Sequence, residues 1–174
     1  MYNPGIGFRL AFSGQPDPAK PWSLLAACEP NPRAPPGRFE YTNLGYNIAT
    51  ILTDRKLGVR WQDLLEREIF APAGMMRSSA RMSRPTSQAW SIARPHMAGA
   101  DGKVAPIYLQ KTDQTMQSAG GVIMSANDAL RLLELMIEDG RLGGRQIIPV
   151  SAIAQSRTPM AQVGDMFEGY RREQ

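Results

Sequence analysis

The stretch APPGRFEYTNLGYNIATIL (residues 34–52) carries the clearest structural pattern in this chain of 174 residues. Its first half contains Pro36-Gly37, a pair that favours a turn. From residue 44 onward, apolar residues fall at i, i+4, i+7 and i+8, the spacing of one face of a helix. Asn43 is suited to cap that helix, and Tyr41 is an aromatic residue two positions earlier. The sequence therefore predicts a turn that leads Tyr41 and Asn43 to the start of a helix.

A second helix follows the first after a short link. Gly58 stands where the first helix should end, and apolar residues at helical spacing then run from Trp61 to Ile69. The residues APAG (71–74) should stop this second helix, because proline and glycine are poor helix formers. Two helices joined by so short a link are predicted to form a helical hairpin.

The most regular helix is predicted within SAGGVIMSANDALRLLELMIEDG (118–140). Ser125 is suited to cap it, with Asp128 three residues later in the manner of a capping box, and Gly140 closes it. The predicted apolar face of this helix, 126–139, consists of Leu130, Leu132, Leu133, Met136 and Ile137. A shorter helix is predicted around 149–156.

The chain divides by composition into three parts. Residues 1–40 are rich in proline and glycine and are expected to wrap over a surface with little regular structure. Residues 41–160 contain the predicted helices. Within them, 75–118 shows no sustained period and is predicted to be irregular with one short strand, a length of loop that is usually functional or disordered. Residues 161–174 form a tail without a clear terminal element.

Composition and charge exclude several classes of function. The net charge is +4 and the pI is near 9.5, but the basic residues are spread out and no groove-reading motif accompanies them, so no nucleic-acid partner is expected. No run of about 18 apolar residues is present, so no membrane span is expected. The single cysteine excludes an internal disulfide and a cysteine-based zinc site, and neither a metal nor another cofactor is expected. A natural N-terminus would leave the chain in the cytoplasm, whereas a longer parent protein could be periplasmic or secreted.

The motif PPGRFEYTNLGYN (35–47) resembles the second active-site motif of the serine β-lactamase and penicillin-binding-protein superfamily, most closely its class C, esterase-like and D-aminopeptidase branches. In that motif, a Pro-Gly turn and an aromatic residue precede Tyr-Ser/Thr-Asn, which here is Tyr41-Thr42-Asn43. The similarity continues through EREIFAPAGMMRSS (66–79) and SAGGVIMSANDALRLLELMIEDGRLGGRQII (118–148). It extends over residues 9–160.

The resemblance implies an α+β fold, of which this chain supplies the mostly helical central portion with long loops and few strands. It also implies an acyl-enzyme mechanism in which the serine of an S-x-x-K motif is the nucleophile. Tyr41 would be the catalytic general base or proton relay, and Asn43 would bind the amide or carbonyl of the substrate. The substrate would be a small ester, amide or β-lactam.

Two parts of the family pattern are missing from the sequence. No serine is followed three residues later by lysine, and the nearest arrangement, Thr53 with Lys56, lies inside the first predicted helix. Residues 111–113 read Lys-Thr-Asp, which lacks the glycine of K-T-G and comes before the helix that K-T-G should follow. His96 lies in a loop rich in proline and glycine and is expected to be a rim residue rather than a member of a catalytic triad.

Two functions from different classes remain open. The first is a serine hydrolase of this superfamily that does not turn over acyl substrates by itself, because its nucleophile is not in this chain. The second is a non-catalytic truncated homologue that binds a ligand or partner at Tyr41 and Asn43. Self-association is a further expectation, since the apolar face of helix 126–139 would be exposed and such patches drive pairing.

Overall fold

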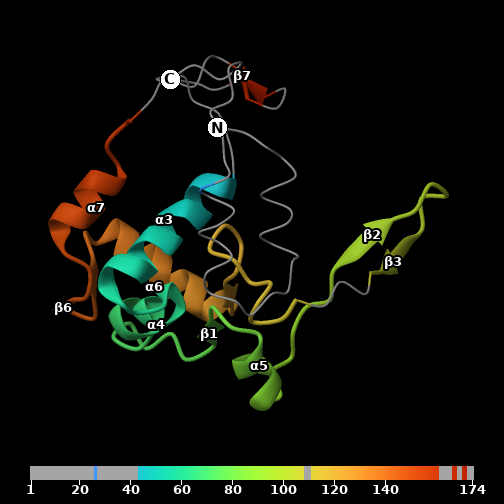
Figure 1. The fold of residues 1–174 in the computed structure, drawn as a ribbon, viewed down its shortest axis with the longest axis horizontal. Helices are drawn as coiled ribbons and strands as arrows, with labels where there is room; N and C mark the ends of the chain where they lie inside the picture. Colours follow the sequence, from blue (N-terminus) through green and yellow to red (C-terminus); the bar gives the residue numbers. More distant parts are fainter. Residues whose placement is uncertain (1–25, 27–42, 108–110, 161–165, 168–169, 172–174) are drawn as a thin grey trace.

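A computed structural model of the chain describes residue 26 and residues 43–107, 111–160, 166–167 and 170–171 (Figure 1). Tyr41, the predicted wrapping segment 1–40 except residue 26, and most of the tail lie outside these residues. The described part is mostly helical, and its strands form four separate two-stranded antiparallel ladders. The predicted α+β class, with long loops and few strands, is confirmed.

The first predicted helix is α3, Asn43–Leu57. It ends as expected at Gly58, whose φ of +64° is in the left-handed region that favours glycine. Of the predicted apolar face, Ile48 and Ile51 are partly buried, whereas Leu52 is exposed. Apolar burial alone therefore does not explain the position of α3.

The second predicted helix is divided into two. α4 spans Trp61–Leu65 and continues into η1, a turn of π-helix over Glu66–Phe70. The Ala71 N–H donates to the Glu66 carbonyl at 2.9 Å, a bond to the fifth residue back that defines a π-helix. The predicted stop at 71–74 is present, and Gly74 there has a φ of +64°. α3 and α4 contact each other, as a two-helix unit requires.

Asp54 closes the link between α3 and α4. One carboxylate oxygen accepts the Trp61 N–H at 2.6 Å, and the other forms an ion pair with Arg60 Nε at 3.2 Å. Burial raises the pKa of the Asp54 carboxyl, and these two contacts counter only part of that effect. The Asp54 carboxylate therefore connects α3 to α4 although partial burial disfavours its charged form.

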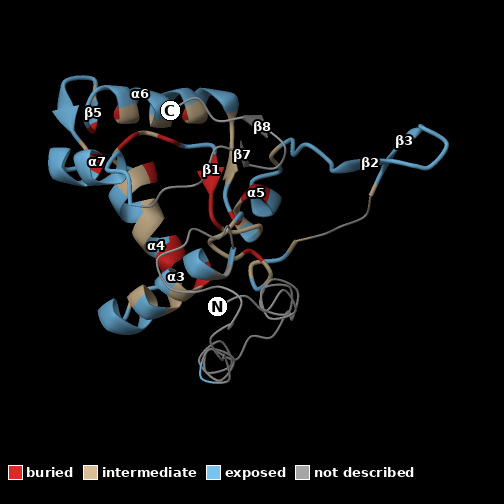
Figure 2. Ribbon diagram, turned by 90° about the horizontal axis from the view of Figure 1, so that it is seen from above, coloured by how far each residue is buried: buried red, intermediate tan, exposed pale blue. Residues whose placement is uncertain are grey.

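The hydrophobic core forms where η1 and the residues after it meet α6, Ala126–Ile137. Its buried members are Phe70, Ala73, Met75 and Leu135, and around them pack Leu65, Ile69, Met124, Leu132, Leu142, Ile147 and Ile148. Leu135 has no exposed surface. Figure 2 shows the buried residues gathered between the elements and the exposed ones on the outer faces of the helices. The core thus joins segments that are far apart in the sequence.

The apolar face predicted for α6 is only partly the buried one. Leu130, Leu133 and Ile137 are 63%, 56% and 72% exposed. Leu135, which the periodicity analysis did not include, is the residue that enters the core. The prediction located the helix correctly but assigned its buried side incorrectly, because α6 carries apolar residues around much of its circumference.

The start of α6 is capped as predicted. Ser125 Oγ accepts the N–H of Asp128 at 3.2 Å. The Asp128 carboxylate has partners outside the helix, because it accepts the Arg77 N–H at 2.7 Å and the Ser78 hydroxyl at 2.8 Å. The side chain expected to complete a capping box therefore attaches α6 to the segment after η1.

Residues 75–118 are more regular than predicted. They contain β1 (Ser78–Ser79), the short helix α5 (Ser83–Ser87), β2 (His96–Ala98) and β3 (Val104–Pro106) instead of one short strand. β1 pairs antiparallel with β4 (Ile123–Met124). The prediction was wrong because periodicity cannot reveal strands of two or three residues.

β2 and β3 form a hairpin that projects from the helices, and residues 91–106 are called the arm (Figures 1 and 2). At its turn, the Gly99 N–H donates to the Lys103 carbonyl at 2.8 Å, and at its base the Ile107 N–H donates to the Pro95 carbonyl at 2.9 Å. Every residue of the arm is exposed. Since a lone two-stranded hairpin is marginally stable at best, the arm depends on these local bonds.

Three smaller units complete the described part. β5 (Arg141–Leu142) and β6 (Arg145–Gln146) form a hairpin after α6. α7, Val150–Ser156, is the short helix predicted around 149–156. In the tail, where no clear element was predicted, β7 (Met166–Phe167) pairs with β8 (Tyr170–Arg171). No helix within the described ranges has the length and apolar character of a membrane span.

Candidate functional site

Asn43, the predicted substrate-binding residue, is the first residue of α3 and is exposed. This agrees with the predicted cap to within the one-residue uncertainty of helix ends. At this end of a helix the first backbone N–H groups have no intrahelical partner, and the helix dipole favours negative charge. The predicted proton carrier Tyr41 lies outside the described residues.

Asn43 belongs to a polar stripe on α3. Asn43, Asn47 and Thr50 are spaced i, i+4 and i+7, so they share one face of the helix. Asn47 is only 2% exposed, and Thr50 is partly buried. α3 therefore turns polar side chains toward another part of the chain.

The stripe contacts the turn 118–121, whose sequence is Ser-Ala-Gly-Gly. Asn47 Oδ1 accepts the Ala119 N–H at 3.3 Å and the Ser118 hydroxyl at 3.2 Å. Ser118 Oγ also lies 2.9 Å from Thr50 Oγ1 and 3.0 Å from the Tyr46 carbonyl oxygen. Because a hydroxyl carries one proton, Ser118 donates to one of three oxygens, which belong to Asn47, Tyr46 and Thr50. These contacts form a junction between α3 and the turn, which consists of Asn47, Thr50, Ser118 and Ala119.

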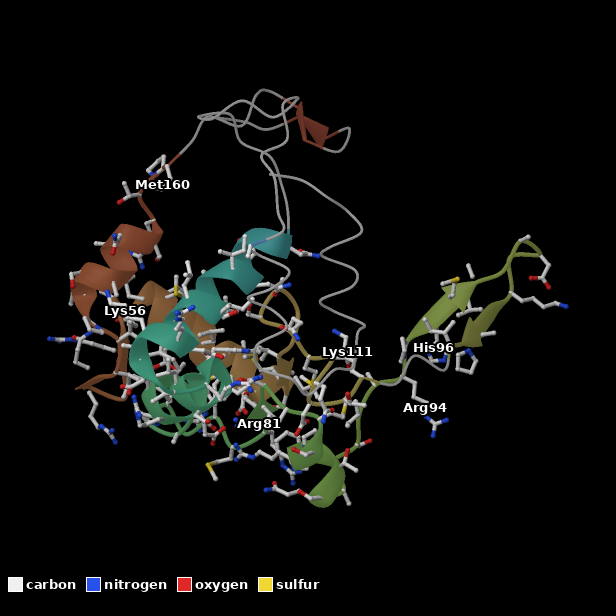
Figure 3. The ribbon with its side chains drawn as sticks, viewed as in Figure 1. Lys56, Arg81, Arg94, His96, Lys111 and Met160 are labelled. Atoms are coloured by element: carbon white, nitrogen blue, oxygen red, sulfur yellow. The ribbon has the colours of Figure 1, made fainter. Side chains whose placement is uncertain are left out.

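Two glycines shape the turn, and a lysine is attached to it. Gly120 has a φ of +136°, and a Cβ on Gly121 would lie 2.4 Å from the Gln117 carbonyl oxygen, a distance that only glycine avoids. The Lys111 ammonium donates to the Gly120 carbonyl at 2.9 Å. Lys111 is partly buried, and Figure 3 shows it between the helices and the arm. The lysine of the incomplete K-T-G pattern is therefore bound to the turn that contacts α3.

Asp113 ties the same segment to α5. Its Oδ1 accepts the Ser83 N–H at 2.8 Å. Burial acts to raise the pKa of the Asp113 carboxyl, but hydrogen bonds from Ser83 and Met82, together with the charge of Arg81, outweigh burial and lower that pKa. The fold thus favours the charged form of Asp113. The hydrogen bond between Ser83 and Asp113 joins residues on either side of the arm.

The other candidates from the sequence lie away from Asn43. Lys56 is thirteen residues further along α3, which places it about 20 Å away along the axis at 1.5 Å per residue, and Figure 3 shows it toward the other end of the helix. The Thr53 hydroxyl donates to a carbonyl of its own helix at 2.8 Å. His96 is exposed on the arm, with Nδ1 2.8 Å from the Arg94 carbonyl oxygen. Neither Lys56 nor His96 is brought to the N-terminal end of α3.

Hydrogen bonding is the chemistry that this site offers. A side-chain amide such as that of Asn43 both donates and accepts, and a lysine ammonium adds donors and a positive charge. Within the described ranges, no three His, Cys, Asp or Glu side chains gather as metal ligands would. The exposed Asn43 amide has the donors and the acceptor that a hydrogen bond to a carbonyl or amide group requires.

The sequence predicted the place of Asn43 at the start of α3 but gave no indication of the junction. The available signal was a polar residue at i+4 and another at i+7 from Asn43, which a search for apolar spacing does not detect. Ser118 follows Asn47 by 71 residues, and no pattern in the sequence pairs the two. Only the folded chain brings them together.

Comparison with known proteins places the chain in a family. The family model for β-lactamase matches residues 2–173. A search of curated proteins found no match.

Solved structures share the fold over part of their length. The octameric penicillin-binding-protein homologue from Pyrococcus abyssi superimposes with a TM-score of 0.70 and 22% identity, over 97% of this chain and 39% of that one. A penicillin-binding protein from Bacillus halodurans gives 0.59 and 20%, over 89% of this chain and 45% of that one. The D-amino acid amidase from Ochrobactrum anthropi gives 0.51 and 24%, over 66% and 31%. The chain therefore spans less than half the length of each of these structures.

Proposed function

Since this chain belongs to the β-lactamase family, we propose that it is the central, largely helical part of a serine hydrolase that transfers acyl groups to water. Its substrates are small esters, amides or β-lactams. Tyr41 acts as general base or proton relay, and Asn43 binds the amide or carbonyl of the substrate. The main support is the position of Asn43, which begins α3 on the stripe that the junction attaches to the turn 118–121.

A tyrosine in this role needs a cation beside it. The pKa of free tyrosine is near 10, so at pH 7 only about one phenol in a thousand is ionised. Lowering that pKa to neutrality takes roughly 4 kcal/mol, at 1.36 kcal/mol per unit. A nearby ammonium favours the charged form, and the family uses the lysine of S-x-x-K. No serine of this sequence has a lysine three residues later, so we expect the chain alone not to turn over acyl substrates.

Complementation tests the proposed activity. The chain is mixed with a polypeptide that carries S-x-x-K and the late strands of a family member, and hydrolysis of nitrocefin or a nitrophenyl ester is followed. Activity should appear only in the mixture and should be lost with Tyr41→Phe. Tyr46→Phe is the matched control, because Tyr46 is 62% exposed and its backbone carbonyl makes the contact with Ser118.

Two results would contradict this proposal. A nitrophenol burst from the chain alone, abolished by Tyr41→Phe, would show that it contains its own nucleophile. A mixture in which the two polypeptides demonstrably bind each other and yet hydrolyse nothing would argue against a shared active site.

The exposed Asn43 amide at the start of α3 also suits a second candidate, a non-catalytic homologue that binds a ligand or partner at Tyr41 and Asn43. A β-lactam or a boronate should then bind reversibly, with no covalent change in the mass of the chain. Asn43→Ala should weaken that binding. Formation of a covalent adduct would exclude this candidate.

We also propose self-association through the exposed face of α6, formed by Leu130, Leu133 and Ile137. The related protein from Pyrococcus abyssi is octameric, which is consistent with assembly in this fold. Sedimentation velocity at several concentrations should show a larger species that Leu133→Lys removes. Met160→Lys is the control, since Met160 is 87% exposed outside α6. A monomer at every concentration would contradict the proposal.

A further inference from the structure

Asn47 is an unusual choice for a buried helical position. Asparagine is among the weaker helix formers, and burying an amide is costly unless its hydrogen bonds are made. Asn47 is only 2% exposed, so its amide needs hydrogen-bond partners within the fold. The amide adds directional hydrogen bonding, because Asn47 Oδ1 accepts the Ala119 N–H and lies 3.2 Å from the Ser118 hydroxyl oxygen.

The junction holds the first two turns of α3 in one position relative to the turn 118–121. The side-chain oxygen of Asn47 accepts the backbone N–H of Ala119. The hydroxyl oxygens of Thr50 and Ser118 lie 2.9 Å apart. Two contacts on successive turns of a helix restrain its rotation and its translation along the axis. Asn43 is four residues before Asn47 on the same face, so its position follows from theirs.

Lys111 is attached to the same turn, because its ammonium donates to the Gly120 carbonyl at 2.9 Å. The junction therefore fixes two things relative to each other, the amide at the start of α3 and the ammonium on the turn. If the junction were released, both would still be present, but their separation would no longer be defined.

We propose that Asn47 and Thr50 are positioning residues that act through Ser118 and Ala119 to hold Asn43 in place for an acyl ligand. The proposal rests on the proposed function, in which Asn43 contacts the substrate. It goes beyond that function by assigning the geometry of the site to a contact between segments 71 residues apart.

α3 offers a matched pair of threonines for the test. Thr50 and Thr53 are both partly buried, and both donate within the helix, but only Thr50 is bonded to Ser118. Thr50→Ala removes the junction hydroxyl, Thr50→Ser retains it, and Thr53→Ala removes a hydroxyl of the same kind elsewhere. Asn47→Ala removes the amide itself.

The experiment uses the full chain, labelled with ¹⁵N. Three quantities are measured: the resonance of the Asn43 side-chain amide, the hydrogen exchange of the Ala119 amide, and the Kd for benzylpenicillin. In Asn47→Ala, Ala119 exchange should accelerate at least about tenfold, the Asn43 resonance should move, and penicillin affinity should fall about tenfold. Thr50→Ala should show the same changes to a smaller extent, and Thr50→Ser and Thr53→Ala should match the wild type.

The outcomes separate this proposal from the proposed function. Faster Ala119 exchange with an unmoved Asn43 resonance would make the junction merely structural and would overturn the positioning role, whatever the affinity. A moved Asn43 resonance in a chain that binds no penicillin would support positioning and count against an acyl ligand. Should Asn47→Ala fail to fold, the three threonine variants decide the question.

Discussion

The helical body, which comprises the described residues 43–90 and 111–160, and the arm differ in the contacts that stabilise them. In the body, Leu135 has no exposed surface and packs with Phe70, Ala73 and Met75 from a distant segment. In the arm, every residue is exposed, and among the described strands β2 and β3 pair only with each other. The body is ordered by contacts between segments, and the arm by bonds within one short loop.

This difference separates local preference from tertiary stabilisation. α6 has a strong local signal, with the Ser125 cap and abundant apolar residues, yet its orientation is set by Leu135 and Asp128, which contact other segments. The arm has only local signals and no buried residue. Burial of apolar surface is the largest stabilising contribution to folding, so the two regions should respond very differently to substitution.

The largest effect is expected from a cavity in the body. Leu135→Ala should lower the free energy of unfolding by about 2–5 kcal/mol, because it removes buried methyl groups and leaves a void. Urea denaturation followed by circular dichroism measures it. Leu52→Ala, at a position 50% exposed on α3, should cost much less. Equal losses for the two variants would mean that the core does not stabilise the body.

The next effect concerns the carboxylate that attaches α6 to the segment after η1. Asp128→Ala should destabilise the fold by about 1–3 kcal/mol, since it leaves the Arg77 N–H and the Ser78 hydroxyl without their acceptor. The neighbouring Asn127 is exposed, and Asn127→Ala should change stability by less than about 0.5 kcal/mol. Unchanged hydrogen exchange of the Arg77 amide in Asp128→Ala would contradict the assignment.

A smaller effect should appear as pH dependence, with opposite signs at two acids. The pKa of Asp113 is lowered in the folded state, so its contribution to stability is present above the unfolded value of 3.8 and is lost as the pH falls through the folded value. The pKa of Asp54 is raised, so its contribution is greatest below 3.8 and declines as the pH rises through the folded value.

Urea titrations between pH 3 and 6 on Asp113→Asn and Asp54→Asn test these signs. The stability difference between wild type and variant should grow with pH for Asp113 and shrink for Asp54. Each change should stay below about 1 kcal/mol, because both carboxyls are partly exposed and contacts near the surface are weak. Parallel pH profiles for the two variants would refute the signs.

The smallest effect is expected in the arm. Met97→Ser and Val104→Ser replace side chains that are 61% and 67% exposed, and each should alter global stability by less than about 0.5 kcal/mol. Amides of β2 and β3 should exchange much faster than those of α6. A loss of 2 kcal/mol would show that the arm is packed against something in solution, and the contrast between the two regions would then fail.

The sequence by itself located boundaries of the predicted helices, although it did not reveal α5 or the division of the second helix into α4 and η1. Gly58, Gly74, Ser125 and Pro149 mark boundaries that the structure reproduces, because caps and breakers act within a few residues. It also placed Asn43 at the start of α3. These are local properties, and each is readable from a short window. The α+β class was instead implied by the family resemblance, which extends over residues 9–160. The role of Tyr41, which lies outside the described residues, stays a prediction.

Tertiary structure alone decided which faces are buried and which distant groups meet. The entry of Leu135 into the core, the bonds from Asp128 to the segment after η1, and the contact of Asn47 with Ser118 all join segments separated by fifty residues or more. No local pattern encodes such pairs, since their energy is gained only after the chain has closed the intervening loop. For that reason the helices could be predicted from short stretches of sequence, whereas the contacts of the junction are seen only in the folded structure.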